Sequence, residues 1–547
     1  MNGNWRGPGG AVAAEADVKR YRGNPWAVLL VVSLGFFMTL LDLTIVNIAI
    51  PNMISRLHAS LDDVLWVINA YALVLAVLLI TAGRLGDLLG QRRMFFAGVV
   101  VFTLASAACG LSPGAGWLVA FRAVQGLGAA MLMPQTLAIL TMVFPPERRG
   151  AAFGVWGAVA GVATIAGPTL GGLLVTTFDW RYIFFINIPV GAAVLILTVV
   201  LVPDLRTGQR HYFDIAGVLL ASGALLAICF GLVEGQRYNW GKVVSFISIP
   251  LILGVGVVLL GLFLWVQARK QDAEPLVPFS LFRDRNFSLM NFVAATISIG
   301  ILGIYLPFVI YLQSVLGFSA LKAGLTLAPA SVIAMFIAPV AGRLSDRIGG
   351  KYILITGLAC FSVGMGWLAL IAQPTSAWYD FFAPQLVAGI GMGCTFAPMT
   401  TVAMRDISPR MAGAASGMFN TTRQVGSVIG TAGVGALLQN RLLDALTSQA
   451  RQRTVGLPAA TRAHLISGFQ AAARSGLEGG SGHRLTGLPG QIFSHGFVDA
   501  MRPTMLTPIG ILLIGAASCL LIRRGQHAPA GPRTEVPEAP EASTALG

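Results

Sequence analysis

Long apolar segments separated by short polar gaps run through almost the whole chain. A helix needs about 20 mainly apolar residues to cross roughly 30 Å of hydrocarbon. Fourteen segments meet this need: 27–50, 64–83, 94–112, 117–140, 152–175, 183–202, 214–234, 245–267, 288–312, 322–342, 352–371, 381–404, 412–438 and 504–522. Because a backbone in lipid must satisfy its own hydrogen bonds, these segments are expected to be helices. The pattern predicts an all-α polytopic membrane protein with fourteen transmembrane helices.

Composition excludes several other classes of protein. Hydrophobic residues make up 55% of the 547 residues and charged residues only 11%, whereas a soluble protein carries about 25% charged residues. A soluble enzyme, a disordered chain and a disulfide-stapled chain are therefore excluded. The net charge of +14 would indicate nucleic acid in a soluble protein. Here the basic residues lie mostly in the gaps between apolar segments, so we expect a lipid bilayer and no nucleic acid as partner.

The distribution of Lys and Arg predicts the orientation. Basic residues concentrate in the two tails and in the gaps that lie on the same side of the membrane as the N-terminus. The short gaps on the other side of the membrane hold few basic residues. The positive-inside rule then places both termini in the cytoplasm. The Arg-rich composition suggests a bacterial source, so we expect a multi-pass protein of the bacterial cytoplasmic membrane. The first apolar segment is too long for a signal-peptide core and should remain as the first helix.

An internal repeat divides the chain. Residues 83–90 (GRLGDLLG) follow the second segment, and residues 342–349 (GRLSDRIG) follow the tenth, 259 positions later. A second similarity in sequence relates residues 125–134 to residues 388–398. The predicted organisation is an N-terminal tail at 1–25, six-helix bundles at 26–203 and 287–524, a linker with two extra helices at 204–286, and a disordered tail at 525–547. The second bundle includes a long outer loop at 439–503. Duplicated bundles of this kind are typical of secondary transporters.

These motifs resemble those of the major facilitator superfamily, and within it the fourteen-helix drug:proton antiporters of the EmrB/QacA type. Three further segments carry the resemblance: 41–51 (LDLTIVNIAIP), 167–172 (GPTLGG) and 180–189 (WRYIFFINIP). The resemblance implies the superfamily fold of two pseudo-symmetric six-helix bundles plus two inserted helices. It also implies a gating loop at the cytoplasmic end of each bundle, which consists of Gly83, Asp87, Gly90, Arg92, Arg93, Gly342, Asp346 and Gly349. The antiporter motif is matched by Gly167, Pro168, Gly171 and Gly172, although Ala163 replaces an upstream glycine of that motif.

Asp42 is the strongest single candidate for function. It lies within an apolar segment, where an acid costs roughly 2.5–3.5 kcal/mol on insertion scales. Burial favours its neutral form and a nearby cation favours its charged form. Arg122 lies within about one helical turn of the same depth in the fourth segment, so the two can pair or exchange a proton through water. In the resembling family the motif Arg122-Ala123-Val124-Gln125-Gly126 is assigned to proton transfer. The alternatives are a structural Asp42 and an Arg122 that reaches the outer headgroups.

Other polar residues within the segments have less specific roles. Arg423 and Gln424 lie midway along 412–438, and with Asn47 and Gln125 they are candidates for substrate contact or charge balance. A cation at this depth must face a cavity or a partner, so Arg423 could neutralise Asp42, meet an anionic substrate group or bond to carbonyls. Wrong spacing at 235–243 excludes an ATP-binding loop. The histidines lack metal-ligand spacing. We expect no metal or cofactor.

The predicted function is export of amphipathic drugs, antibiotics or secondary metabolites, driven by the proton gradient. Its partners are a small amphipathic substrate, protons and the bilayer. A proton-coupled uptake symporter and a receptor or lipid-handling protein that has lost transport are the alternatives. The sequence gives neither the substrate nor the oligomeric state.

Overall fold

Helices account for nearly all of the described chain. The computed structural model describes residues 24–523 except 58, 60, 205–213, 236, 239, 272–274, 409–410, 456–457 and 475–486. The first half contains α1 (Pro25–Leu57), α2 (Leu61–Leu89), α3 (Gln91–Gly110), α4 (Ala115–Val143), α5 (Arg149–Thr177), α6 (Tyr182–Phe185) and α7 (Asn187–Leu201). The second half contains α10 (Ser280–Arg283), α11 (Arg285–Ile310), α12 (Ala320–Ile348), α13 (Gly350–Ile371), α14 (Phe382–Met404), α15 (Ala412–Arg453), α16 (Ala459–Arg474) and α17 (Gly487–Ser518).

Between the halves lies an inserted pair, α8 (Ile215–Glu234) and α9 (Ile249–Arg269), joined by a hairpin of β1 (Lys242–Val244) and β2 (Ile247–Ser248). The two strands pair antiparallel. Short helical turns η3 (Pro146–Arg148), η4 (Tyr311–Val315), η5 (Trp378–Phe381) and η8 (Cys519–Leu521) complete the described elements. Among the described residues, twelve helices are long and apolar enough to cross a membrane. The two remaining predicted segments correspond to α5 and α15, which pack among the twelve.

Both ends of the described chain lie at the same end of the bundle. Trp26, at the start of α1, packs edge-to-face on Phe144 at the end of α4. At the other end of the chain, Lys351 at the start of α13 donates a hydrogen bond to the carbonyl of Leu520. Asp346, near the end of α12, accepts a hydrogen bond from a backbone amide in the first turn of α5. Because α5 follows α4 and α13 follows α12, this bond places the two contacts at the same end of the bundle. We call this the inner end, because the sequence predicts it to be cytoplasmic, and the opposite one the outer end.

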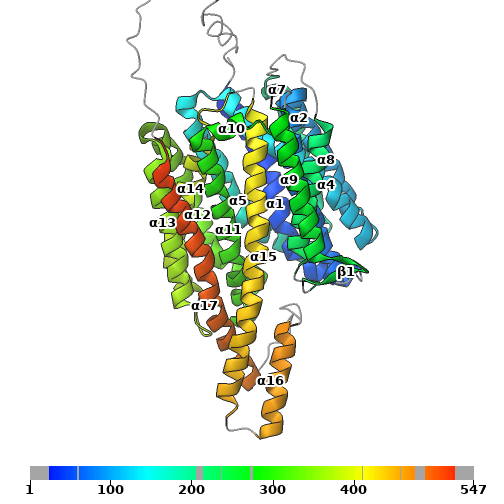
Figure 1. Cartoon of the computed structure of the whole chain (residues 1–547), viewed down its shortest axis with the longest axis vertical. Helices are drawn as coiled ribbons and strands as arrows, with labels where there is room; N and C mark the ends of the chain where they lie inside the picture. Colours follow the sequence, from blue (N-terminus) through cyan, green and yellow to red (C-terminus); the bar gives the residue numbers. More distant parts are fainter. Residues whose placement is uncertain are drawn as a thin grey trace, which may run out of the picture.

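The two halves meet through two helix pairs. Helix α5 of the first half packs along α12 of the second, and α2 packs along α15. The inserted pair lies against α2 and α15, beside α15 in Figure 1. Small residues allow these close approaches: a Cβ on Gly154 would lie 2.7 Å from the Ala338 carbonyl, and one on Gly417 would lie 2.9 Å from the Leu79 carbonyl.

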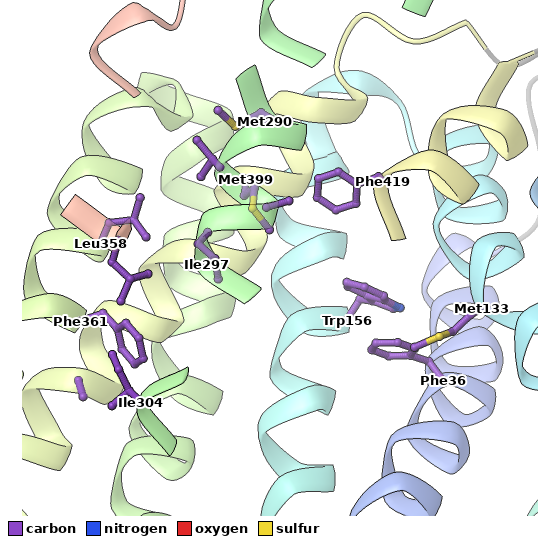
Figure 2. Close-up of a cluster of buried hydrophobic side chains, with 14 of the residues drawn as sticks. Phe36, Met133, Trp156, Met290, Ile297, Ile304, Leu358, Phe361, Met399 and Phe419 are labelled. Atoms are coloured by element: carbon purple, nitrogen blue, oxygen red, sulfur yellow. The ribbon is translucent and has the colours of Figure 1, made fainter. Parts of the chain in front are cut away.

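Apolar side chains from both halves fill the interior (Figure 2). Phe36 of α1 stacks on Trp156 of α5 with ring centroids 4.2 Å apart. Phe419 of α15 belongs to the same buried cluster, as do Ile297 and Phe361 of the second half. The interior is therefore continuous between the halves.

The segment 439–503, predicted as an outer loop, is largely helical where it is described. Helix α15 continues past the predicted end at residue 438 to Arg453, and α17 begins at Gly487 rather than at 504. The two helices stay in contact there: Gln449 donates to Asp499 at 2.8 Å, and Leu446 packs against Gly496. Figure 1 shows α16 projecting beyond the outer end. Hydropathy marks where a segment leaves lipid, whereas these helices continue beyond that point.

Candidate functional site

Asp42 and Arg122 form an ion pair inside the first half. Arg122 Nη1 donates to Asp42 Oδ2, and both side chains are completely buried. Asp42 lies on α1 and Arg122 on α4, so the pair joins two helices that are distant in sequence. The pairing that the similar depths allowed is therefore present, and Arg122 does not reach the outer headgroups. Removing one partner of such a buried pair costs about 3–5 kcal/mol.

Gln125 completes the pair by bonding to both partners. Its Nε2 donates to Asp42 Oδ1 at 2.9 Å, and its Oε1 accepts from Arg122 Nη1 at 2.8 Å. Arg122 Nε donates to the Val67 carbonyl at 2.9 Å. Arg122 Nη2 has no hydrogen-bond partner among the described residues. Both N–H groups of Nη2 are therefore unpaired in the described structure.

Aromatic and apolar residues enclose the pair. The Arg122 guanidinium lies 4.3 Å from the ring centroid of Tyr71 and 5.8 Å from that of Phe184. On the outer side, a separate cluster that includes Met53, Leu118 and Trp180 is fully buried. The described residues leave Asp42 no exposed surface.

The segment 180–189 supports this site, a role that the sequence reasoning missed. Asn187 of α7 lies against the Asp42 carboxylate and donates to Ser106 at 3.0 Å. Ser106 donates in turn to the Phe184 carbonyl at 2.9 Å. Cys109 Sγ donates to Gln125 Oε1 at 3.6 Å. The sequence feature that could have indicated this role is a polar residue, Asn187, within an apolar segment.

At the inner end, Asp87 and Asp346 each cap a helix of the opposite half. Asp87 accepts from the backbone amides of Gly413 and Ala414, both at 2.8 Å. Asp346 accepts from those of Gly150 and Ala151, at 2.8 and 2.9 Å. A carboxylate is favoured at a helix N-terminus because the first amides lack partners and the dipole is positive there. The two aspartates lie within α2 and α12, not in loops as predicted.

Glycines of the repeated motif at 83–90 and 342–349 allow the halves to touch. A Cβ on Gly83 would lie 2.4 Å from the Gly413 carbonyl, and one on Gly342 would lie 2.1 Å from the Gly150 carbonyl. Gly90 and Gly349 end the motif with φ of 98° and 84°, a backbone conformation that disfavours residues with side chains. Arg92 donates to the Val199 carbonyl of α7 at 2.7 Å, and Arg93 is exposed.

Arg149 forms a third connection between the halves at the inner end. Its Nη1 donates to the carbonyls of Met404 and Arg405 at 3.0 and 3.3 Å, and its Nη2 donates to that of Thr141 at 2.7 Å. Its Nε donates to the Phe144 carbonyl at 3.3 Å. One buried guanidinium therefore satisfies carbonyls at the C-terminal ends of α4 and α14 together. The sequence reasoning missed Arg149 because it lies among other basic residues in a gap.

The antiporter motif places α5 against α1. A Cβ on Gly167 would lie 2.0 Å from Thr44 Oγ1, and one on Gly171 would lie 2.9 Å from Ile45 Cγ1. Gly172 faces open space. Pro168 lies within α5, and its side chain is not among those that the structure describes.

The remaining candidates lie apart from one another, some buried and some exposed. Arg423 packs over the Phe396 ring at 5.2 Å, and its Nε has no partner among the described residues. Gln424 is half-buried beside it, and Asn47 is exposed and donates to the Leu43 carbonyl. Within the described part of the chain no ion pair joins Arg423 to Asp42, whose charge Arg122 balances. Gln385, the counterpart of Arg122 in the repeat, is buried with both amide atoms unpartnered in the described structure.

Comparisons with known proteins agree with this architecture. The family model of the Major Facilitator Superfamily matches residues 32–431. The tetracenomycin C resistance and export protein of Streptomyces glaucescens is 32% identical over 524 residues, covering 94% of each chain. The multidrug export protein EmrB of Escherichia coli is 31% identical over 425 residues, covering 75% of this chain and 79% of EmrB. The crystal structure of the human organic anion transporter MFSD10 shares the fold, with a TM-score of 0.57 and 12% identity over 90% of this chain and all of that one.

The chain therefore belongs to the major facilitator superfamily, in the fourteen-helix drug:proton antiporter family of the EmrB/QacA type. It is a multi-pass membrane transporter. Among the described residues, no group of three or more His, Cys, Asp or Glu side chains could hold a metal ion.

Proposed function

We propose that this protein exports amphipathic drugs, antibiotics or secondary metabolites across the bacterial cytoplasmic membrane in exchange for protons, by alternating access. The ion pair of Asp42 and Arg122 is the observation that carries the proposal. A carboxylate kept in an apolar bundle beside one cation has two stable situations: ionised and paired, or protonated and released. The export names of relatives such as the tetracenomycin C protein support the substrate class.

Proton binding is coupled to conformation through the partners of Asp42. Protonation removes the charge that Arg122 and Gln125 hold between α1 and α4. Arg122 is then left buried with an uncompensated charge, which disfavours this packing. Since a ligand shifts two states only by binding them unequally, the proton selects the state that lets Arg122 relax.

The inner end supports an alternating cycle. Asp87, Asp346 and Arg149 each connect the halves there, and these contacts support a state of the cycle in which the inner end is closed. We infer that substrate enters when these contacts open and leaves when they close again. Both termini and this inner end face the cytoplasm in the proposed orientation.

Transport by Asp42→Asn in proteoliposomes tests the coupling. The variant keeps the size of the side chain but cannot take up and release a proton. We expect loss of export driven by a pH gradient, while exchange of labelled substrate for unlabelled substrate continues without a gradient. The retained exchange separates uncoupling from misfolding. Normal gradient-driven export by this variant would exclude the proposal, and substrate moving in the same direction as protons would favour a symporter.

A further inference from the structure

An apolar cavity lies away from the ion-pair site, between the inserted pair and the second half. Its volume is about 350 Å³. Leu225 of α8 and Phe263 of α9 form one wall, Ile299 of α11 and Val425 of α15 form another, and Ile80 of α2 closes it. The cavity thus touches the first half, the inserted pair and the second half together.

The cavity opens toward the surrounding bilayer. Three of its lining side chains are substantially exposed: Leu264 is 47% exposed, Phe282 40% and Ile429 43%. All three are apolar, so the opening is lined by groups that favour hydrocarbon over water. A ligand that enters here comes from lipid.

The long dimension of the cavity follows the helices. Phe282 lies just before α11, which begins at Arg285. Ile299 lies about 21 Å along α11 from Arg285, at 1.5 Å rise per residue. One leaflet of hydrocarbon is about 15 Å deep, half of the roughly 30 Å core. The cavity therefore reaches from the inner end to about the middle of the bilayer, which is the path of one acyl chain.

Polar groups lie at two depths along the cavity, and those at the inner end mark where the head of such a ligand would lie. Thr421 is 4% exposed and lines the cavity, and its hydroxyl has no hydrogen-bond partner among the described residues. Thr421 lies nine residues after the start of α15, about 14 Å along the helix at the same rise per residue, so it lies beside the tail of a bound chain and not beside its head. Arg283 and Arg285 follow Phe282 in the chain and are both exposed at the inner end, where headgroup phosphates lie.

From this geometry we propose that the cavity binds one acyl chain of a phospholipid from the inner leaflet. The bound chain contacts α2, the inserted pair and α15 at once, so it supports the packing of α2 on α15 that holds the inner end closed. The proposal concerns a lipid and stands independently of the exported substrate.

Photolabelling in proteoliposomes tests the site, with a phospholipid that carries a diazirine on its acyl chain. We expect crosslinks on the lining of α8, α9 and α15. Ala295→Leu and Ala221→Leu fill the cavity from opposite walls and should each lower this labelling severalfold. Ala193→Leu makes the same change on an exposed position of α7 and should leave the labelling unchanged.

Melting temperature in detergent provides the second measurement. Added phospholipid should raise the melting temperature of the wild type and of Ala193→Leu, and this rise should be lost in the two filled variants. Two results would overturn the proposal. One is undiminished labelling in folded Ala295→Leu and Ala221→Leu. The other is labelling of the cavity by a diazirine-bearing amphipathic drug but not by the phospholipid, which would assign it to the substrate route.

Discussion

Asp87 and Asp346 occupy the same position of the repeated motif, and each caps the first amides of a helix in the other half. The halves therefore exchange equivalent carboxylates at the inner end. Opening that end must break both sets of bonds, so both aspartates are expected to stabilise the closed state.

Replacing Asp87 by Asn should shift the protein toward the state open at the inner end. Hydrogen bonds to a charged group contribute about 1.5–3 kcal/mol, and the amide keeps only part of this. We expect a shift of about 1–2 kcal/mol in the equilibrium between the two states. Distances between spin labels on the two halves at the inner end measure it. Arg148→Gln removes a charge from an exposed side chain at the inner end and should leave the distances unchanged.

Arg149 should be sensitive to both charge and shape. Arg149→Gln leaves several carbonyls of α4 and α14 without donors, and each buried unsatisfied group costs about 1–3 kcal/mol. Arg149→Lys keeps the charge but cannot reach both helix ends with one planar group. We expect both variants to open the inner end, Gln more than Lys, as seen by labelling of cysteines introduced there. Closed-state labelling in Arg149→Gln would contradict a gating role.

The glycines of the antiporter motif should differ sharply from one another. Gly167→Ala places a methyl group against Thr44 Oγ1 and should destabilise the packing of α5 on α1 by about 1–3 kcal/mol. Gly172→Ala meets open space and serves as the control. The new methyl group would meet both Oγ1 and Cβ of Thr44, so Thr44→Gly, which removes both atoms, should recover part of the melting temperature and export when added to Gly167→Ala. A double variant as unstable as Gly167→Ala would show that the clash is not the cause.

Asp214 should stabilise the inserted pair at neutral pH and lose this effect only in acid. Burial by itself raises the pKa of Asp214, but bonds from Lys270, Gly217 and Gln267 outweigh it and hold that pKa below its usual value. The stabilisation is complete above the unfolded pKa of about 3.9 and is lost as pH falls through the lower folded pKa. The melting-temperature gap between wild type and Asp214→Asn should therefore stay constant from about pH 8 to 5 and close below about pH 4. A gap that changes near neutral pH would contradict this assignment.

The sequence predicted the fold well because lipid imposes a strong length and polarity requirement on each helix. It also identified Asp42, Arg122 and the two capping aspartates, because charged residues in or beside apolar segments are conspicuous. It could not predict that Asn187 supports Asp42 or that Arg149 reaches two helix ends. Periodicity assigns a residue to a helix but does not specify which helix lies opposite. For the same reason it left open whether Arg423 pairs with Asp42.

The continuity of α15 has a mechanical consequence. Its 42 residues form one helix of about 63 Å, from the amides capped by Asp87 to the projection that carries α16. If such a rod tilts as a unit by about 10°, its far tip is displaced by roughly 11 Å, given the same rise per residue. A fluorescent reporter attached to that tip would therefore report tilting of α15 that begins at the other end of the helix, on the opposite side of the membrane.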